Sequence, residues 1–182
     1  MEKNPTRPLA LGLIVLGALT RLAPHPANLV PVGGLSLFAG ARLQGWRAYL
    51  VPLMLMAVTD PLLGGYSFAT PFVYASLLIN VWIGMRLRST ESPWKIGGAA
   101  LAGATQFFLI ADFGTWLGST QLYPHTWAGL MACYVAAIPF FWRTLAGDLF
   151  YATAFFGVYA LVRRMAERGD TLGQNPAGVE LR

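Results

Sequence analysis

The sequence predicts an all-α integral membrane protein, and three observations carry this prediction. Of the 182 residues, 55% are hydrophobic and 12% are charged, which is too apolar for a soluble single domain. The apolar residues form a series of runs separated by short polar segments. The Lys and Arg residues lie between these runs rather than on one basic face, so we expect no nucleic-acid partner.

We predict six membrane-spanning helices in a single transmembrane domain, residues 1–182. About 20 residues are needed to cross a typical bilayer, so the shorter runs are assigned from charge and from their flanks. The run at 127–142 contains Pro139 and follows a polar loop, and we therefore expect a short re-entrant or lid-like helix there, in the long outer loop before the last span. The predicted spans are residues 8–22, 29–43, 47–64, 71–87, 95–112 and 145–165.

The first run has the basic start and the apolar core of a secretory signal peptide. Arg21 interrupts the position where a small-residue cleavage site should lie, and further spans follow. We therefore expect a retained first helix.

The basic residues predict the orientation, because Lys and Arg concentrate in cytoplasmic loops. With six spans both termini are cytoplasmic. In the alternative, the run at 127–142 crosses and the run at 29–41 re-enters, which would leave Arg42 and Arg47 outside. The basic residues that the six-span topology places inside include Lys3, Arg7, Arg42, Arg47, Arg86, Arg88, Lys95, Arg163, Arg164 and Arg168.

Polar and aromatic side chains gather at the outer ends of the predicted spans, which indicates a binding face. Near-membrane charges are costly unless paired, so we expect Arg143 to pair with Asp60 or with Asp148. Helix capping and loop solvation are the simpler explanation for any single residue of this set. The candidate ligand-binding residues are His25, Asn28, Asp60, Tyr66, Tyr74, Tyr123, His125 and Arg143.

The chain has no motif of a conventional enzyme or motor. It contains no GxxxxGK[ST] phosphate loop, no HExxH and no GxSxG, and its single cysteine, Cys133, has no nearby thiol for zinc. We therefore expect neither a catalytic site nor an ATP-binding loop.

Four blocks of sequence resemble the BtuM-type membrane proteins, which are related to the substrate-binding S-components of energy-coupling-factor vitamin transporters. The resemblance covers about residues 8–165 and implies cobalamin uptake across a bacterial inner membrane. It also implies a vitamin cavity at the outer face, built from the loops at 22–30, 60–71 and 112–144. The blocks are PHPANLVPVGGLSLFAGA, VPLMLMAVTDPLLGGY, DFGTWL and YPHTWAGLMACYVAAIPFFWRTLAGDLF.

Two departures qualify what this resemblance implies. The first run lacks the pair of small residues four apart that often docks S-components onto a shared energising module, which favours a transporter that works without the module. The loop at 67–71 lacks the cysteine with which some relatives ligate the corrin cobalt. Imidazole is a suitable replacement, so His25 is the first candidate ligand of the corrinoid cobalt, while His125, Cys133 and the absence of any protein ligand remain open.

Three prolines surround His25 and Asn28 in the stretch RLAPHPANLVPVGG. Proline disfavours helix in itself and in the residue before it, so the backbone leaves the helix here. At membrane depth, irregular backbone is tolerated where it lines a protein cavity, and we expect both side chains to face one. A solvated periplasmic turn is the alternative.

Two other functions remain open from the sequence. The protein could carry another vitamin than cobalamin, or it could be a structural or accessory subunit of a membrane complex that uses the outer polar face as a contact surface. An intramembrane enzyme is less favoured, because the carboxylates lack a recognisable catalytic arrangement.

Overall fold

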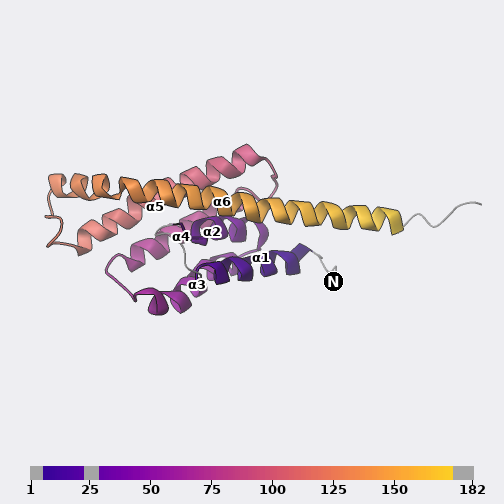
Figure 1. Ribbon diagram of the computed structural model, residues 1–182, viewed down its shortest axis with the longest axis horizontal. Helices are drawn as coiled ribbons and strands as arrows, with labels where there is room; N and C mark the ends of the chain where they lie inside the picture. The colour runs from indigo at the N-terminus through magenta and orange to yellow at the C-terminus, as the bar shows by residue number, and fades with distance from the viewer. Residues whose placement is uncertain (1–5, 23–28, 174–182) are drawn as a thin grey trace, which may run out of the picture.

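The computed structural model describes residues 6–22 and 29–173, and these residues are helical with short connections and no strand (Figure 1). The all-α prediction is therefore confirmed for the described part of the chain. The helices are α1 (Thr6–Thr20), α2 (Val32–Arg42), α3 (Arg47–Leu63), α4 (Thr70–Met85), α5 (Pro93–Gly118) and α6 (Trp127–Gly173).

Two of these helices, α5 and α6, are long and apolar enough to cross a membrane. The apolar parts of α1 and α4 are shorter, and α2 has 11 residues, which reach about 16 Å at 1.5 Å per residue. A bilayer core is about 30 Å thick. The expectation of six complete spans is therefore not supported, and the described residues form six helices where six spans and a separate short helix were expected.

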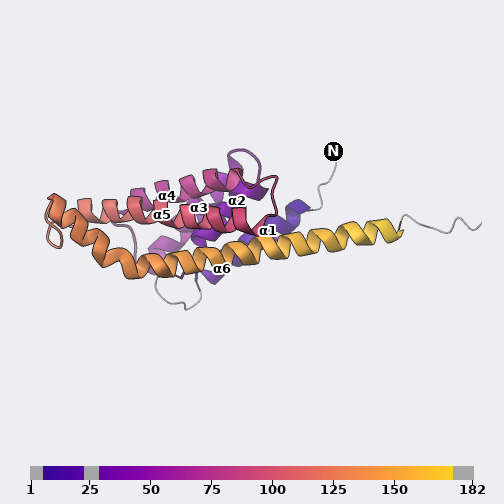
Figure 2. The same ribbon diagram turned by 90° about the horizontal axis from the view of Figure 1, so that it is seen from above.

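Helix α6 is continuous over 47 residues, and this corrects the expected lid-like segment at 127–142. Pro139, which in the sequence indicated a separate short helix, lies inside this continuous helix. Figure 2 shows that α6 changes direction in its orange part and then runs straight. A proline removes one backbone hydrogen bond and bends a helix, but flanking turns hold the helix together.

Helix α2, in the region where a span was predicted at 29–43, is the centre of the bundle. All its residues from Val32 to Ala41 are buried, and it contacts each of the other five helices. The ring of Phe38 packs against Phe155 and Phe156 of α6 with centroid distances of 5.7 and 5.3 Å. An apolar run that is buried in protein on all sides looks in sequence like one that faces lipid.

Glycines allow the backbones of α2 and α4 to touch. A Cβ atom added at Gly40 would collide with the carbonyl oxygen of Val81, and one added at Gly84 would collide with the carbonyl oxygen of Leu37. Because the obstacle in each case is backbone, no side-chain movement can relieve the collision. Small residues at such crossings are the usual means by which helices in membranes approach closely.

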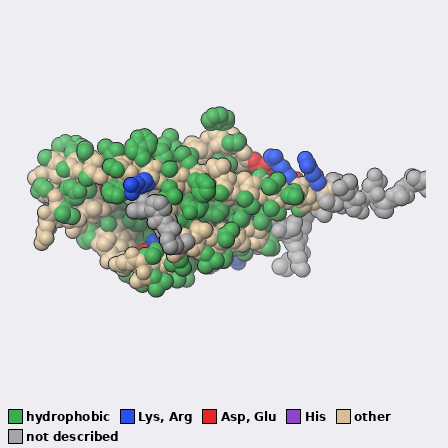
Figure 3. Space-filling model, viewed as in Figure 1, with side chains coloured by type: hydrophobic (Ala, Val, Ile, Leu, Met, Phe, Trp, Pro, Cys, Tyr) green, Lys and Arg blue, Asp and Glu red, His purple; other side chains and the backbone are tan. Residues whose placement is uncertain are grey.

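The bundle has two distinct ends (Figure 1). At one end α1 begins, α2 ends and α6 projects beyond the other helices. We call it the arginine-rich end, because Arg42, Arg88, Arg163 and Arg164 lie there. The loop end carries the α3–α4 connection at 64–69 and the α5–α6 connection at 119–126. Figure 3 shows hydrophobic side chains over most of the face in view, with basic and acidic groups gathered where α6 leaves the body.

The close approach of α2 and α4 predicts that alanine at Gly40 lowers the stability of the protein, whereas alanine at Gly98, on the exposed side of α5, does not. Gly40→Ala should destabilise the protein by about 1–3 kcal/mol, because the added methyl group meets backbone. Gly98→Ala, in an exposed turn of α5 with no atom within 4 Å of the added Cβ, should be neutral or stabilise by up to about 1 kcal/mol. Thermal unfolding of the detergent-solubilised variants measures both, and equal effects would contradict this account of the crossing.

Candidate ligand-binding cleft

A cleft lies inside the helix bundle between α2 and the last four helices. It consists of two hollows of about 210 and 170 Å³ that share Val73, Phe107 and Thr144 in their walls, and we call both together the central cleft. Its walls are mostly apolar, with a few polar groups. The other lining residues are Arg21, Val30, Val32, Gly33, Met56 and Leu77 of the larger hollow, and Phe108, Ala111, Asp112, Ala137, Phe140 and Phe141 of the smaller.

A buried ion pair between Arg21 and Asp60 borders the cleft. The Arg21 Nη2 atom lies 2.7 Å from Asp60 Oδ1, and the side chains of both residues are 10% exposed. Tyr74 donates its hydroxyl hydrogen to the other carboxylate oxygen, Oδ2, at 3.0 Å. Arg21 also donates to the hydroxyl of Thr59, which in turn donates to the carbonyl oxygen of Leu55 at 2.7 Å.

This network joins three helices. Arg21 follows the last turn of α1, Asp60 lies in the last turn of α3, and Tyr74 lies in the first turns of α4. Both carboxylate oxygens of Asp60 already have partners, so its first role is to hold these helix ends together. The Arg21 side chain still lines the larger hollow, where it can offer a positive charge to a ligand.

The expected pairing of Arg143 is wrong for both carboxylates. Asp60 pairs with Arg21, while Asp148 is buried and accepts a hydrogen bond from the backbone nitrogen of Gly34 at 3.1 Å. Arg143 lies exposed on α6 and forms no ion pair within the described residues. The carboxylate of Asp148 also fills the space beside Gly33, so it ties α6 to the first turn of α2.

The remaining predicted site residues do not join Asp60 and Tyr74. His125 lies in the α5–α6 connection, with its Nε2 atom 3.1 Å from the carbonyl oxygen of Leu117 and its ring beside Trp116. Tyr123 lies in the same connection. Tyr66 is exposed in the α3–α4 connection and donates to the carbonyl oxygen of Ala57 at 3.1 Å.

His25 and Asn28 lie outside the described residues, so the predicted cobalt ligand stays a prediction. Cys133 is buried between α5 and α6, where its thiol donates to the carbonyl oxygen of Asp112 at 3.6 Å. Within the described ranges, no three His, Cys, Asp or Glu side chains come together as a group that could hold a metal ion.

The family model of DUF6580, described as a family of unknown function, matches residues 1–169 of this chain. The chain belongs to the DUF6580 family. No curated protein and no solved structure matches it. The match to DUF6580 spans all six helices and both hollows of the central cleft, apart from the last residues of α6.

Sequence reasoning missed the aromatic wall of the cleft in this DUF6580 chain. Two pairs of adjacent phenylalanines, at 107–108 in α5 and 140–141 in α6, face the smaller hollow. The ring of Phe108 packs 5.3 Å from that of Phe141. The signal in the sequence was the repetition of Phe-Phe in two consecutive apolar runs, together with Asp112 and Thr144 one turn further along each helix.

A double-mutant cycle should separate the ion pair from its surroundings. Arg21→Gln or Asp60→Asn alone leaves one buried charge without its partner and should cost about 3–5 kcal/mol of stability. The double variant should cost less than the sum of the two single variants, because no charge is left unpaired. Arg143→Gln is the control and should change stability by less than about 0.5 kcal/mol. Thermal unfolding in detergent measures the four variants, and additive losses would show that the pair is not coupled.

Proposed function

We propose that the protein takes up a vitamin-sized organic molecule across a bacterial inner membrane and binds it in the central cleft. The observation that carries the proposal is the cleft itself. Its walls come from five helices and are mostly apolar, and the few polar groups include Arg21, Asp112 and Thr144. Small-molecule sites in proteins commonly combine apolar walls with a few polar groups that fix the orientation of the ligand.

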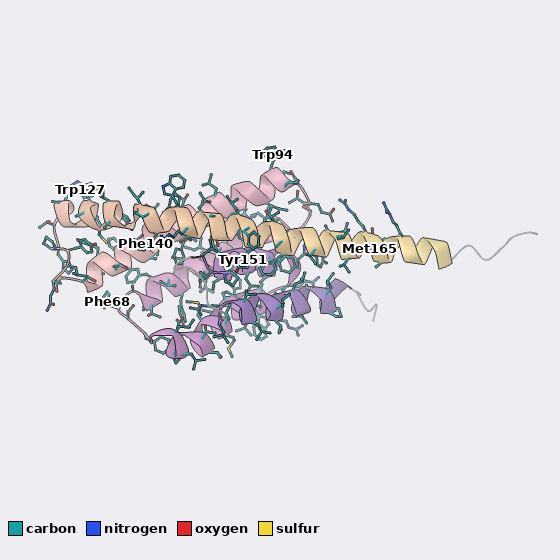
Figure 4. All side chains as sticks on the ribbon, viewed as in Figure 1. Phe68, Trp94, Trp127, Phe140, Tyr151 and Met165 are labelled. Carbon is teal, nitrogen blue, oxygen red and sulfur yellow. The ribbon has the colours of Figure 1, made fainter. Side chains whose placement is uncertain are left out.

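The exterior of the bundle supports a membrane location. Large hydrophobic side chains are exposed along the helices, among them Leu16 and Leu19 of α1, Val58 of α3 and Val135 of α6. Trp94 and Trp127 are 91% and 74% exposed and lie at the two ends of the α5–α6 pair (Figure 4). Tryptophan is enriched where a membrane protein meets the polar headgroups.

The resemblance to the BtuM-type proteins supports uptake in preference to another membrane function. A chain of six helices is also the architecture of the related S-components. On α1, Gly17 faces the ring of Phe155 and the side chain of Leu35, so it is not free to contact a separate energising module. We propose that transport proceeds without such a module.

The size of the cleft distinguishes two candidate ligands. Cavities for drug-sized ligands usually measure about 300–1,000 Å³, and a corrinoid is larger than such ligands. The two hollows measure about 210 and 170 Å³, which favours a vitamin smaller than cobalamin. Cobalamin, which the resemblance implies, would require the helices around the cleft to separate at the loop end.

The proposed orientation places the arginine-rich end in the cytoplasm, because α1 begins and α6 ends there among Lys and Arg residues. A reporter that is active only in the cytoplasm should be active when it is fused after residue 182 or before residue 1. The same reporter inserted in the α5–α6 connection should be inactive. Activity of a periplasm-specific reporter at the C-terminus would contradict this orientation.

Binding to the purified full-length protein tests the ligand. Equilibrium binding of cobalamin, cobinamide and a set of smaller vitamins should identify one that binds, and Thr144→Trp should weaken it about tenfold or more, because Thr144 lines both hollows. Arg143→Trp adds the same ring at the neighbouring exposed position and should bind like the parent. Val73→Phe is a second cleft variant, in case Thr144→Trp does not fold.

Each outcome of this binding experiment has a distinct meaning. Binding of a smaller vitamin that is lost in the cleft variants supports the proposal in full. Binding of corrinoids alone supports uptake and contradicts the size argument. If no vitamin binds and other membrane proteins co-purify in stoichiometric amounts, the protein is an accessory subunit and the proposal is wrong.

A further inference from the structure

A second pocket lies at the arginine-rich end, far from the central cleft. It has a volume of about 140 Å³ and lies between the end of α2, the α4–α5 connection and α6. One part of its wall is charged, with Arg42, Glu91 and Arg164, and the other part is apolar. We call it the arginine pocket; its remaining lining residues are Pro93, Ile96, Thr153, Phe156, Gly157 and Ala160.

Arg42 brings an unpaired positive charge into this pocket. Its guanidinium group lies over the rings of Phe156 and Tyr159, 5.2 and 4.7 Å from their centroids. The Nη1 atom donates to the carbonyl oxygen of Arg88 at 3.4 Å, while the Nε atom is buried without a hydrogen-bond partner in the described part of the chain. A partly buried charge is costly unless an opposite charge or strong acceptors compensate it.

Glu91 forms no ion pair with Arg42, because two other arginines already use its carboxylate. Its Oε1 atom lies 2.8 Å from Arg163 Nη2, and its Oε2 atom lies 3.1 Å from Arg164 Nη2. Arg163 is also paired with Glu167, whose Oε1 atom lies 3.2 Å from Arg163 Nε. The pocket and its rim therefore hold three guanidinium groups and two carboxylates, and Arg42 is the guanidinium group without an ion pair among the described residues. The surroundings add further positive charge from Arg86, which stacks on Trp82, and from Arg88 and Lys95.

We propose that the arginine pocket binds the phosphate group of an anionic phospholipid from the adjacent membrane leaflet. The guanidinium groups of Arg42 and Arg164 match a phosphate in charge and in hydrogen-bond donors. The apolar part of the wall, formed by Ile96, Phe156 and Ala160, matches the first carbons of an acyl chain. A free phosphate ion would use the charged part of this wall and leave the apolar part uncovered. Basic pockets between helices on the cytoplasmic side commonly hold such headgroups.

This inference rests on the proposed membrane location but not on the ligand of the central cleft. The test uses the full-length protein, purified in a neutral detergent and depleted of lipid. Phosphatidylglycerol should raise the unfolding temperature by about 5 °C or more beyond the effect of phosphatidylcholine with the same acyl chains, and inorganic phosphate should not reproduce the effect. Native mass spectrometry should show one phosphatidylglycerol retained per chain.

Matched variants test whether the stabilisation by phosphatidylglycerol comes from the arginine pocket. Arg42→Gln should abolish the difference between the two lipids, whereas Arg47→Gln, which removes an exposed charge at the same end of the bundle, should preserve it. Should Arg42→Gln fail to fold, Arg164→Gln tests the same pocket from a side chain that is 64% exposed.

Three results would overturn the inference. Equal stabilisation by both lipids would exclude recognition of the phosphate charge, and equal stabilisation by inorganic phosphate would identify a site for a soluble anion. Equal losses in Arg42→Gln and Arg47→Gln would show diffuse attraction to the whole basic end. A chain that fractionates away from membranes would contradict the proposed function instead, so the two failures are distinguishable.

Discussion

The backbone contact between α2 and α4 is the constraint on which the rest of the bundle depends. Because Gly40 and Gly84 have no side chain, the backbones of α2 and α4 lie in direct contact. The buried helix α2 also contacts each of the other helices. In the proposed membrane location, lipid gives helices no hydrophobic reason to associate, so close packing and a few polar contacts must supply the attraction. The contacts of α2 provide that packing, and Asp148 adds a hydrogen bond to the backbone of Gly34 at the other end of the same helix.

The central cleft exists because α2 is short. Helix α5 extends about 39 Å, whereas α2 extends about 16 Å from the cleft to the arginine-rich end. The middle of the bundle is therefore filled by protein near the arginines and left partly empty toward the loops. Val32 and Gly33, in the first turn of α2, form the floor of that space. Arg21, which is paired with Asp60, lines the same space.

Local patterns explain what could be predicted from the sequence. Apolar runs and their flanks predicted six spans and a separate short helix, with α3 and α4 within two residues of the observed ends. Periodicity does not reveal whether an apolar face meets lipid or protein, so the burial of α2 was missed. Pro139 indicated a separate lid-like helix at 127–142, although neighbouring turns carry α6 through it. Asp60 was expected to pair with Arg143, whereas its partner is Arg21, because the packing of α1 against the bundle brings Arg21 to the end of α3.

The length of α6 gives the protein a mechanical property. This one helix forms a wall of the central cleft at Thr144 and a wall of the arginine pocket at Arg164, about 30 Å further along its axis. Within α6, the segment after Pro139 contains no further proline that would bend it. A tilt of about 10° at Thr144 would displace Arg164 by about 5 Å. A change in the tilt of α6 at the central cleft would therefore move one wall of the arginine pocket.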